Sequence, residues 1–247
     1  MLINKSIPAV KVIRSLVLLS VMLLAGCEFS DSQFDEARTR ALQNPDPFQA
    51  WQQLNKDAEE NCPDGFLELR PTCSNHIMNE YHDLAISLYR SALKRHSPDA
   101  FADLFIRDDP PDELESQMPE LAKELITLAS HSAGDRASAN VLAAAAHTLE
   151  KGQWVQKDSV RAAAFFAQAW LAGDTRAPAS LSRLYNDQHD NASALLWRLR
   201  CIGECYNRLM ITDDAETMSP REILRIQSLA KDRSIITVNG QVNWEAK

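Results

Sequence analysis

An alanine-rich pair of amphipathic segments between Gly152 and Tyr185 constrains the fold more than any other part of the sequence. The two segments meet at Gly173-Asp174, and small residues alternate in them with large residues at helical spacing. Small side chains let two helix backbones approach closely, and aromatic side chains fill the space between helix pairs. Gly173 stands where the first helix has to end in a left-handed conformation. The stretch therefore predicts a helix–turn–helix packing unit, and it contains no catalytic motif.

This stretch resembles the Sel-one-like repeat, a relative of the tetratricopeptide repeat. The residues that match the family pattern are Gly152, Val155, Asp158, Arg161, Ala162, Phe165, Phe166, Ala169, Gly173, Ala177 and Leu181. The sequence departs from the pattern at Trp154, which replaces the second glycine, at Trp170, which replaces the second alanine, and at Ala145-Ala146, where Leu-Gly is usual. The resemblance implies that Gly152, Asp158, Ala162, Phe166, Ala169, Gly173, Ala177 and Leu181 define the repeat.

Weaker copies of the same spacing occur on both sides of this unit. Tyr89, Thr127 and Phe166 occupy the same position of successive units, and the two steps between them are almost equal in length. A fourth unit, reached by a shorter step, consists of Asp190, Ala194, Trp197 and Cys201, which keep the spacing of Asp158, Ala162, Phe165 and Ala169. Three to four stacked helix pairs bury a continuous core that one pair cannot bury alone. We therefore expect an all-α fold, an α/α solenoid of about three to four helix-pair repeats over residues 75–212.

Extra elements are expected on either side of the repeats. Residues 27–74 are predicted to form a short polar tether over 28–32, then helices over 33–42 and 48–60 and a cysteine-containing loop. Within the repeats, a break at residues 108–112 should be followed by one long helix through about Ser132. In the last region, residues 213–247, a helix should start at Ser219-Pro220. The β-prone runs around Asn239-Gly240 predict a small C-terminal hairpin, which either caps the last helix pair or offers its edge to a partner strand.

The first 26 residues have the pattern of a signal peptide. Lys5, Lys11 and Arg14 precede an apolar run of ten residues, which is too short to span a bilayer as a permanent helix. The run ends in Leu23-Leu24-Ala25-Gly26-Cys27, which resembles the bacterial lipobox. The resemblance implies cleavage before Cys27 and lipid attachment to it, and several acyl chains anchor a protein stably. Glu28 after the cysteine implies the outer membrane, with the protein on its periplasmic side. The alternative is a non-lipidated signal anchor.

The charge of the chain excludes some classes of partner. Removal of the signal peptide takes away three positive charges and no negative ones, so the formal charge moves from −8 to −11. An acidic surface disfavours nucleic acid and electrostatic adhesion to anionic lipid. It fits solubility or a basic protein partner.

Four cysteines remain after lipidation of Cys27. The periplasm is oxidising, which favours disulfides over a metal site. Proximity favours the pairs Cys62–Cys73 and Cys201–Cys205, although four cysteines permit three pairings. Gly203 indicates a turn between the second pair. The metal alternative would combine cysteines with His76 and His82, but a pair six residues apart on a helix points about 240° apart. We expect structural disulfides, no metal and no cofactor.

The sequence contains no motif that indicates an enzyme. H-E-x-x-H, G-x-S-x-G, a glycine-rich phosphate loop and a D-x-D-x-D-G calcium loop are all missing from it. Binding of a partner protein is the activity that remains, because helical-pair solenoids present a continuous array of side chains. Aromatic residues dominate interface hot spots, so Trp154 and Tyr185 are candidate partner-binding residues. Trp170 and Trp197 fit core positions better.

The resemblance implies two roles for such a lipoprotein. One is an immunity protein that neutralises a secreted antibacterial toxin, which the compact size and acidic surface favour. The other is an adaptor or scaffold in envelope or exopolysaccharide assembly. A third hypothesis is a periplasmic hydrolase with an unrecognised site, which predicts a deep pocket with carboxyl groups of shifted pKa.

Overall fold

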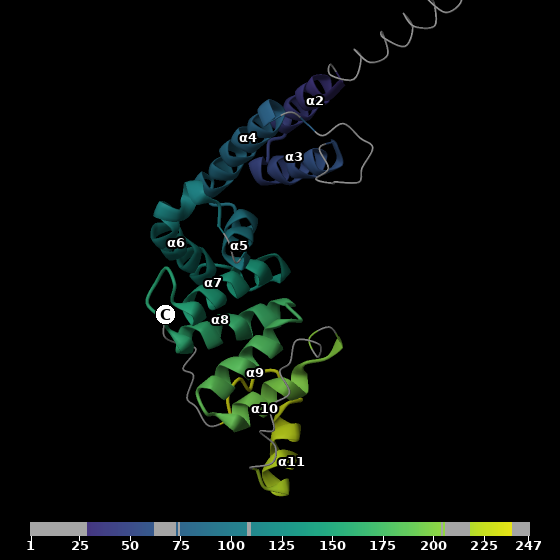
Figure 1. Ribbon diagram of the computed structural model, residues 1–247. Helices are drawn as coiled ribbons and strands as arrows, with labels where there is room; N and C mark the ends of the chain where they lie inside the picture. The colour runs from purple at the N-terminus through teal and green to yellow at the C-terminus, as the bar shows by residue number, and fades with distance from the viewer. Residues whose placement is uncertain are drawn as a thin grey trace, which may run out of the picture. The chain divides into compact units, whose positions relative to one another are not determined.

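The computed structural model describes residues 29–61, 73, 75–107, 110–203, 205 and 218–238. Every regular element in these ranges is a helix (Figure 1), which confirms the all-α class. The predicted signal peptide, Cys27, Cys62 and residues 206–217 and 239–247 lie outside the described residues. In the described part, no helix is both long enough and apolar enough to cross a bilayer. The chain divides into two compact units, Met1–Arg95 and His96–Lys247, so the boundary lies within the region assigned above to repeats.

Three helices form the described part of the first unit: α2 (Phe29–Gln43), α3 (Pro47–Asn61) and α4 (Asn75–Lys94). Helix α2 begins at Phe29, so most of the polar tether predicted over residues 28–32 is helical instead. The predicted break between α2 and α3 is confirmed. The Asp46 carboxylate accepts hydrogen bonds from the backbone N–H groups of Phe48 (2.9 Å) and Gln49 (3.2 Å) at the start of α3. Such a carboxylate satisfies N–H groups that have no partner inside the helix.

The three helices pack against one another around an apolar core. Phe34 of α2 contacts Tyr81 of α4 edge to face, with ring centroids 4.7 Å apart. Trp51 of α3 lies half-buried with its ring edge to face against Tyr89 of α4, at 4.8 Å. The first unit is therefore a three-helix packing with its own core.

The second unit contains the remaining helices: α5 (Pro98–Ile106), the 3-10 helix η1 (Asp112–Gln117), α6 (Met118–Ser130), the 3-10 helix η2 (Arg136–Ser138), α7 (Ala139–Lys151), α8 (Ser159–Ala172), α9 (Ala177–Asp187), α10 (Asn191–Arg200) and α11 (Pro220–Leu229). Helices α7 to α11 each pack against the next along the chain, and α7 also packs against α5 and α6. The alanine run in α7 explains the close packing: Ala144, Ala145 and Ala146 are all fully buried.

One expectation for this unit is wrong. The residues between 112 and 132 do not form one long helix, because η1 and α6 are separate elements that meet at Gln117 and Met118. Pro119 lies in the first turn of α6, where a residue without an N–H group is tolerated, and it has no N–H group with which to continue a helix from η1. The proline therefore starts a new helix instead of continuing the one before it.

The end of the described chain docks on α10. The indole Nε1 of Trp197 donates to the carbonyl of Ile236 at 2.8 Å, and the N–H of Val238 donates to the hydroxyl of Ser193 at 2.9 Å. Residues 235–238 form no strand, and the predicted turn at Asn239-Gly240 lies outside the described residues. The hairpin stays a prediction, whereas the contact between this segment and the last described helix pair is present.

Candidate functional site

The loop between α7 and α8, residues 152–158, is closed at both ends by hydrogen bonds. Gly152 ends α7 in a left-handed conformation (φ +68°), and its N–H donates to the carbonyl of Thr148 at 3.0 Å. The N–H of Asp158 donates back to the carbonyl of Leu149 at 3.0 Å. The Asp158 carboxylate then accepts from the N–H of Arg161 at 3.0 Å and caps α8. These bonds fix the loop against the two helices that it joins.

Gly152 also allows a close approach inside the loop. A Cβ atom added at Gly152 would lie 2.7 Å from the Cβ of Lys157 and 3.1 Å from its Cα. Real Cβ atoms essentially never come within 3.0 Å of another heavy atom, so only glycine fits without a shift of the loop. The loop is therefore tightly closed at Gly152 and Lys157.

Trp154, in the middle of this loop, is half-buried and lies between two hollows of the surface. The smaller hollow has a volume of about 20 Å³ and is lined by Trp154 together with residues of α5, α6 and α7. The larger one is an open groove of about 780 Å³. We call it the Trp154 groove, and its lining residues are Lys123, Ile126, Thr127, Leu149, Trp154, Val155, Gln156, Lys157, Asp158, Ser159 and Arg161. Trp154 is thus partly covered by its own fold and still lines the open groove.

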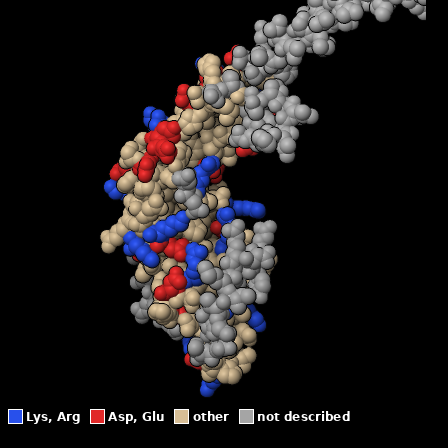
Figure 2. All heavy atoms as spheres, viewed as in Figure 1, with Lys and Arg blue, Asp and Glu red and all other residues tan. Residues whose placement is uncertain are grey.

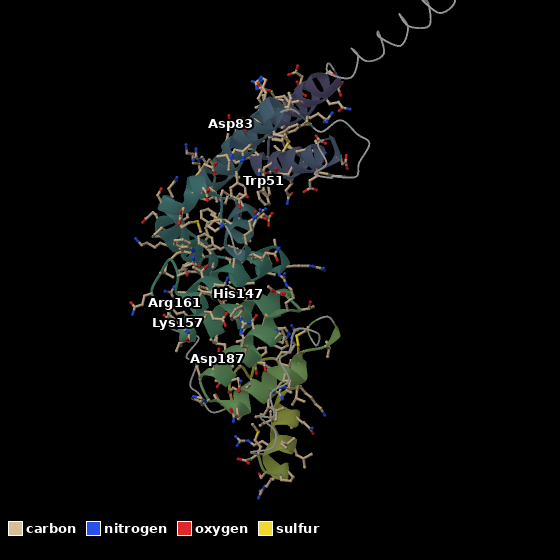
Figure 3. The ribbon with its side chains drawn as sticks, in the orientation of Figure 1. Trp51, Asp83, His147, Lys157, Arg161 and Asp187 are labelled. Atoms are coloured by element: carbon tan, nitrogen blue, oxygen red, sulfur yellow. A yellow bond between two sulfur atoms is a disulfide. The ribbon has the colours of Figure 1, made fainter. Side chains whose placement is uncertain are left out.

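The Trp154 groove combines apolar and cationic side chains. Figure 3 labels Lys157 and Arg161, which lie near each other at the start of α8, and Figure 2 shows Lys and Arg side chains on the face that carries α6, α7 and α8. Lys123 of α6 forms an ion pair with Glu120 at 3.0 Å. This groove is a candidate protein interface, because it is open and contains an accessible aromatic side chain on a fixed loop.

Tyr185, the second candidate for partner binding, is a core residue. Only 5% of it is exposed, so its side chain offers no surface to a partner. Burial, and then the negative charge of Asp190, raise the pKa of the Tyr185 hydroxyl to about 12. The sequence pattern placed Tyr185 on an apolar helix face without showing which neighbouring helix covers that face.

The residues named above as repeat-defining occupy helix ends and core positions between α7 and α9. Gly152 and Gly173 end their helices in left-handed conformations, and Asp158 is the N-terminal cap of α8. The apolar positions of this set are at most 1% exposed: Ala162, Phe166, Ala169, Ala177 and Leu181. Asp190 caps α10 as Asp158 caps α8, since its carboxylate accepts from the N–H of Ser193 at 3.1 Å.

Sequence reasoning missed a cluster around Arg200 at the end of α10. The guanidinium group of Arg200 lies 4.6 Å from the ring centre of Trp197 and 4.8 Å from that of Trp170. It also donates to the carbonyl groups of Ala230 (3.2 Å) and Asp232 (2.5 Å), just after α11. Burial lowers the pKa of Arg200 to about 10. The cluster fastens the end of α11 to α10, and Trp197 is fully buried in it, as expected for a core residue.

The cysteines of the described part are in disulfides. Cys201 and Cys205 are bonded to each other with their Cα atoms 5.2 Å apart, and Gly203 between them has the predicted turn conformation (φ +64°). Cys73 is also disulfide-bonded, and its partner lies outside the described residues. The pairing of Cys62 with Cys73 and the lipidation of Cys27 therefore stay predictions.

A second polar cluster connects α7 and α9. Arg183 donates to Glu150 at 3.0 Å, and the Nδ1 of His147 lies 3.3 Å from the same carboxylate. Burial favours the protonated form of Glu150, but the hydrogen bond to His147 and the charge of Arg183 outweigh it and lower the pKa of this carboxyl. Within the described ranges, no group of three or more His, Cys, Asp or Glu residues could hold a metal ion.

No protein-family model matches this chain, and no curated protein or solved structure is significantly similar to it.

Proposed function

We propose that the chain is a periplasm-facing, membrane-anchored lipoprotein whose helical repeats bind a partner protein through the Trp154 groove. The observation that carries this proposal is the position of Trp154: a half-buried aromatic side chain that lines two hollows, on a loop that hydrogen bonds close at both ends. A side chain held in place before binding loses little conformational entropy when a partner covers it.

The helical-repeat part of the proposal is supported by the likeness of α8 and α10. Both helices begin at an aspartate cap, and the N–H of each cap donates to a carbonyl near the end of the preceding helix: Asp158 to Leu149 at 3.0 Å and Asp190 to Tyr185 at 2.9 Å. The alanine four residues after each cap, Ala162 or Ala194, is fully buried. The same local geometry, an aspartate cap bonded to the preceding helix and followed by a buried alanine, thus occurs at both α8 and α10.

The membrane anchor rests on the sequence around Cys27. The basic segment, the short apolar run and the Leu-Ala-Gly-Cys ending support lipidation and an outer-membrane location on the periplasmic side. Fractionation of cells that express the wild type and a Cys27→Ser variant tests this directly. We expect the wild type in the outer-membrane fraction and the variant outside it, and an unchanged distribution would contradict lipidation.

An immunity role is the favoured form of the binding function, and an adaptor role is its alternative. The hydrolase hypothesis requires carboxyl groups with a functional pKa shift. The carboxyl groups of the described part whose pKa is shifted, Asp135, Glu150, Glu222 and Asp232, all shift downward, and their hydrogen bonds go to caps, turns or an ion pair. These groups give that hypothesis no support.

Capture of the partner tests the proposed function. The lipidated full-length protein serves as bait in a membrane fraction, with Trp154→Ala as the test variant and Leu224→Ala, which truncates an exposed apolar residue of α11, as the control. We expect capture by the wild type and the control and at least about tenfold less by Trp154→Ala. A single hydrolytic toxin would establish the immunity role, and several envelope-assembly proteins would establish the adaptor role. Capture that does not depend on Trp154, or no capture, would refute the proposal.

A further inference from the structure

The charge of the Trp154 groove differs from that of the whole molecule. The chain has a formal net charge of −8, with 34 acidic and 26 basic residues. The lining of the groove instead contains three cationic residues, Lys123, Lys157 and Arg161, and one carboxylate, Asp158. A local positive field on an acidic protein steers a negatively charged segment to that place and repels it elsewhere.

The cations of the groove are not neutralised equally within the molecule. Lys123 is paired with Glu120, and the Asp158 carboxylate accepts the backbone N–H of Arg161 as the cap of α8. Lys157 and Arg161 form no side-chain ion pair with another described residue; the guanidinium of Arg161 lies 5.9 Å from the ring centre of Phe165. Two exposed cations therefore stand at the groove with their charges available to a ligand.

Apolar side chains lie next to these cations. Ile126, Leu149, Trp154 and Val155 line the same groove, and Val160, in the first turn of α8, is 65% exposed. A volume of about 780 Å³ is enough for several side chains of a bound segment, since pockets that enclose small ligands measure roughly 300–1,000 Å³. The arrangement suits a segment with both carboxylates and a large apolar residue.

We propose that the Trp154 groove binds an acidic segment of the partner protein, with an apolar side chain against Trp154 and carboxylates on Lys157 and Arg161. This inference rests on the proposed function, because it names the chemistry of the partner at the same site. Nucleic acid does not fit as well, since its evenly spaced phosphates would be repelled by the net negative charge of the chain.

The test uses a phage-displayed library of random twelve-residue peptides as the probe, panned against the full-length protein in detergent. We expect the enriched peptides to carry an excess of Asp and Glu together with a large apolar residue. A Lys157→Glu/Arg161→Glu double variant should bind them at least about tenfold more weakly, because two attractive contacts become repulsive. The control is Arg221→Glu/Lys231→Glu, which makes the same charge change at two exposed residues outside the groove, and it should bind as the wild type does.

Binding should also weaken as salt is raised from 50 to 500 mM, because salt screens exposed charges. No enrichment, enrichment of peptides without an acidic excess, or equal binding by the two double variants would each overturn the inference. If partner capture still depends on Trp154 in that case, the proposed function stands and only the acidic chemistry is refuted. If the wild type captures no partner either, both the proposed function and the acidic chemistry are refuted.

Discussion

Replacement of Gly152 by alanine should destabilise the protein more than the same replacement at Gly134. The two glycines have nearly the same left-handed backbone, with φ +68° and +69°, so the alanine costs about 1–2 kcal/mol of backbone energy at either position. A Cβ at Gly134 would meet no atom within 4 Å, whereas a Cβ at Gly152 would lie 2.7 Å from the Cβ of Lys157. The atoms that it meets belong to the backbone and Cβ of Lys157, so the loop has to move, which adds roughly 1–3 kcal/mol.

Urea unfolding of the two variants, followed by circular dichroism, measures the difference. We expect the free energy of unfolding to fall by about 1–2 kcal/mol for Gly134→Ala and by about 2–5 kcal/mol for Gly152→Ala. In a thermal melt, each kcal/mol corresponds to about 2–4 °C for a chain of this size. Equal losses would refute the reasoning, because the comparison cancels the backbone energy and leaves only the contact with Lys157. Movement of the loop should also displace Trp154, so Gly152→Ala should reduce partner capture and Gly134→Ala should not.

Three further predictions concern stability. Asp158→Ala and Asp190→Ala should each lower the free energy of unfolding by about 1 kcal/mol through loss of a helix cap, and thermal melts should show similar shifts if the two helices are equivalent. Trp197→Phe should lower the free energy of unfolding by about 1–3 kcal/mol, because the buried carbonyl of Ile236 loses its donor. The indole N–H of Trp170 bonds to no described residue, so Trp170→Phe should lower it by less in the same urea titration. Because the pKa of Glu150 is lowered in the folded state, its ionised form stabilises the fold fully above pH 4.5, its ordinary pKa. This stabilisation is lost as the pH falls through the folded-state pKa. The stability difference between the wild type and Glu150→Gln should therefore shrink below pH 4.5, and a constant difference would contradict the role of the ion pair.

Much of the local structure could be predicted because it depends on neighbours in the chain. Ser219 caps its helix as the sequence indicated, and Ser97 caps α5 in the same way, each followed by a proline in the first turn. The turn at Gly203 and the bond between Cys201 and Cys205 involve residues at most four apart. A cap or a tight turn is decided by hydrogen bonds and backbone preferences within a few residues, so a single sequence contains the information for it.

The functional surface could be predicted only in part. Trp154 stood out because it replaces a glycine of a recognisable loop pattern, and the structure places it at an open groove. Lys123 gave no such signal, since it comes from α6, which all of α7 separates from the loop. Arg200 was missed for the same reason: its contact with the Trp170 ring comes from α8, and the carbonyls that it binds lie after α11.

The sequence by itself determined the helical class, the ends of most helices and the small buried residues of the central unit, because helical periodicity and capping are properties of short stretches. Only the tertiary structure decided that Tyr185 is buried while Trp154 lines an open groove, and that Lys157 and Arg161 lie beside the apolar residues of another helix. Burial and charge clustering depend on which helix faces meet, and that follows from the packing of residues far apart in the chain.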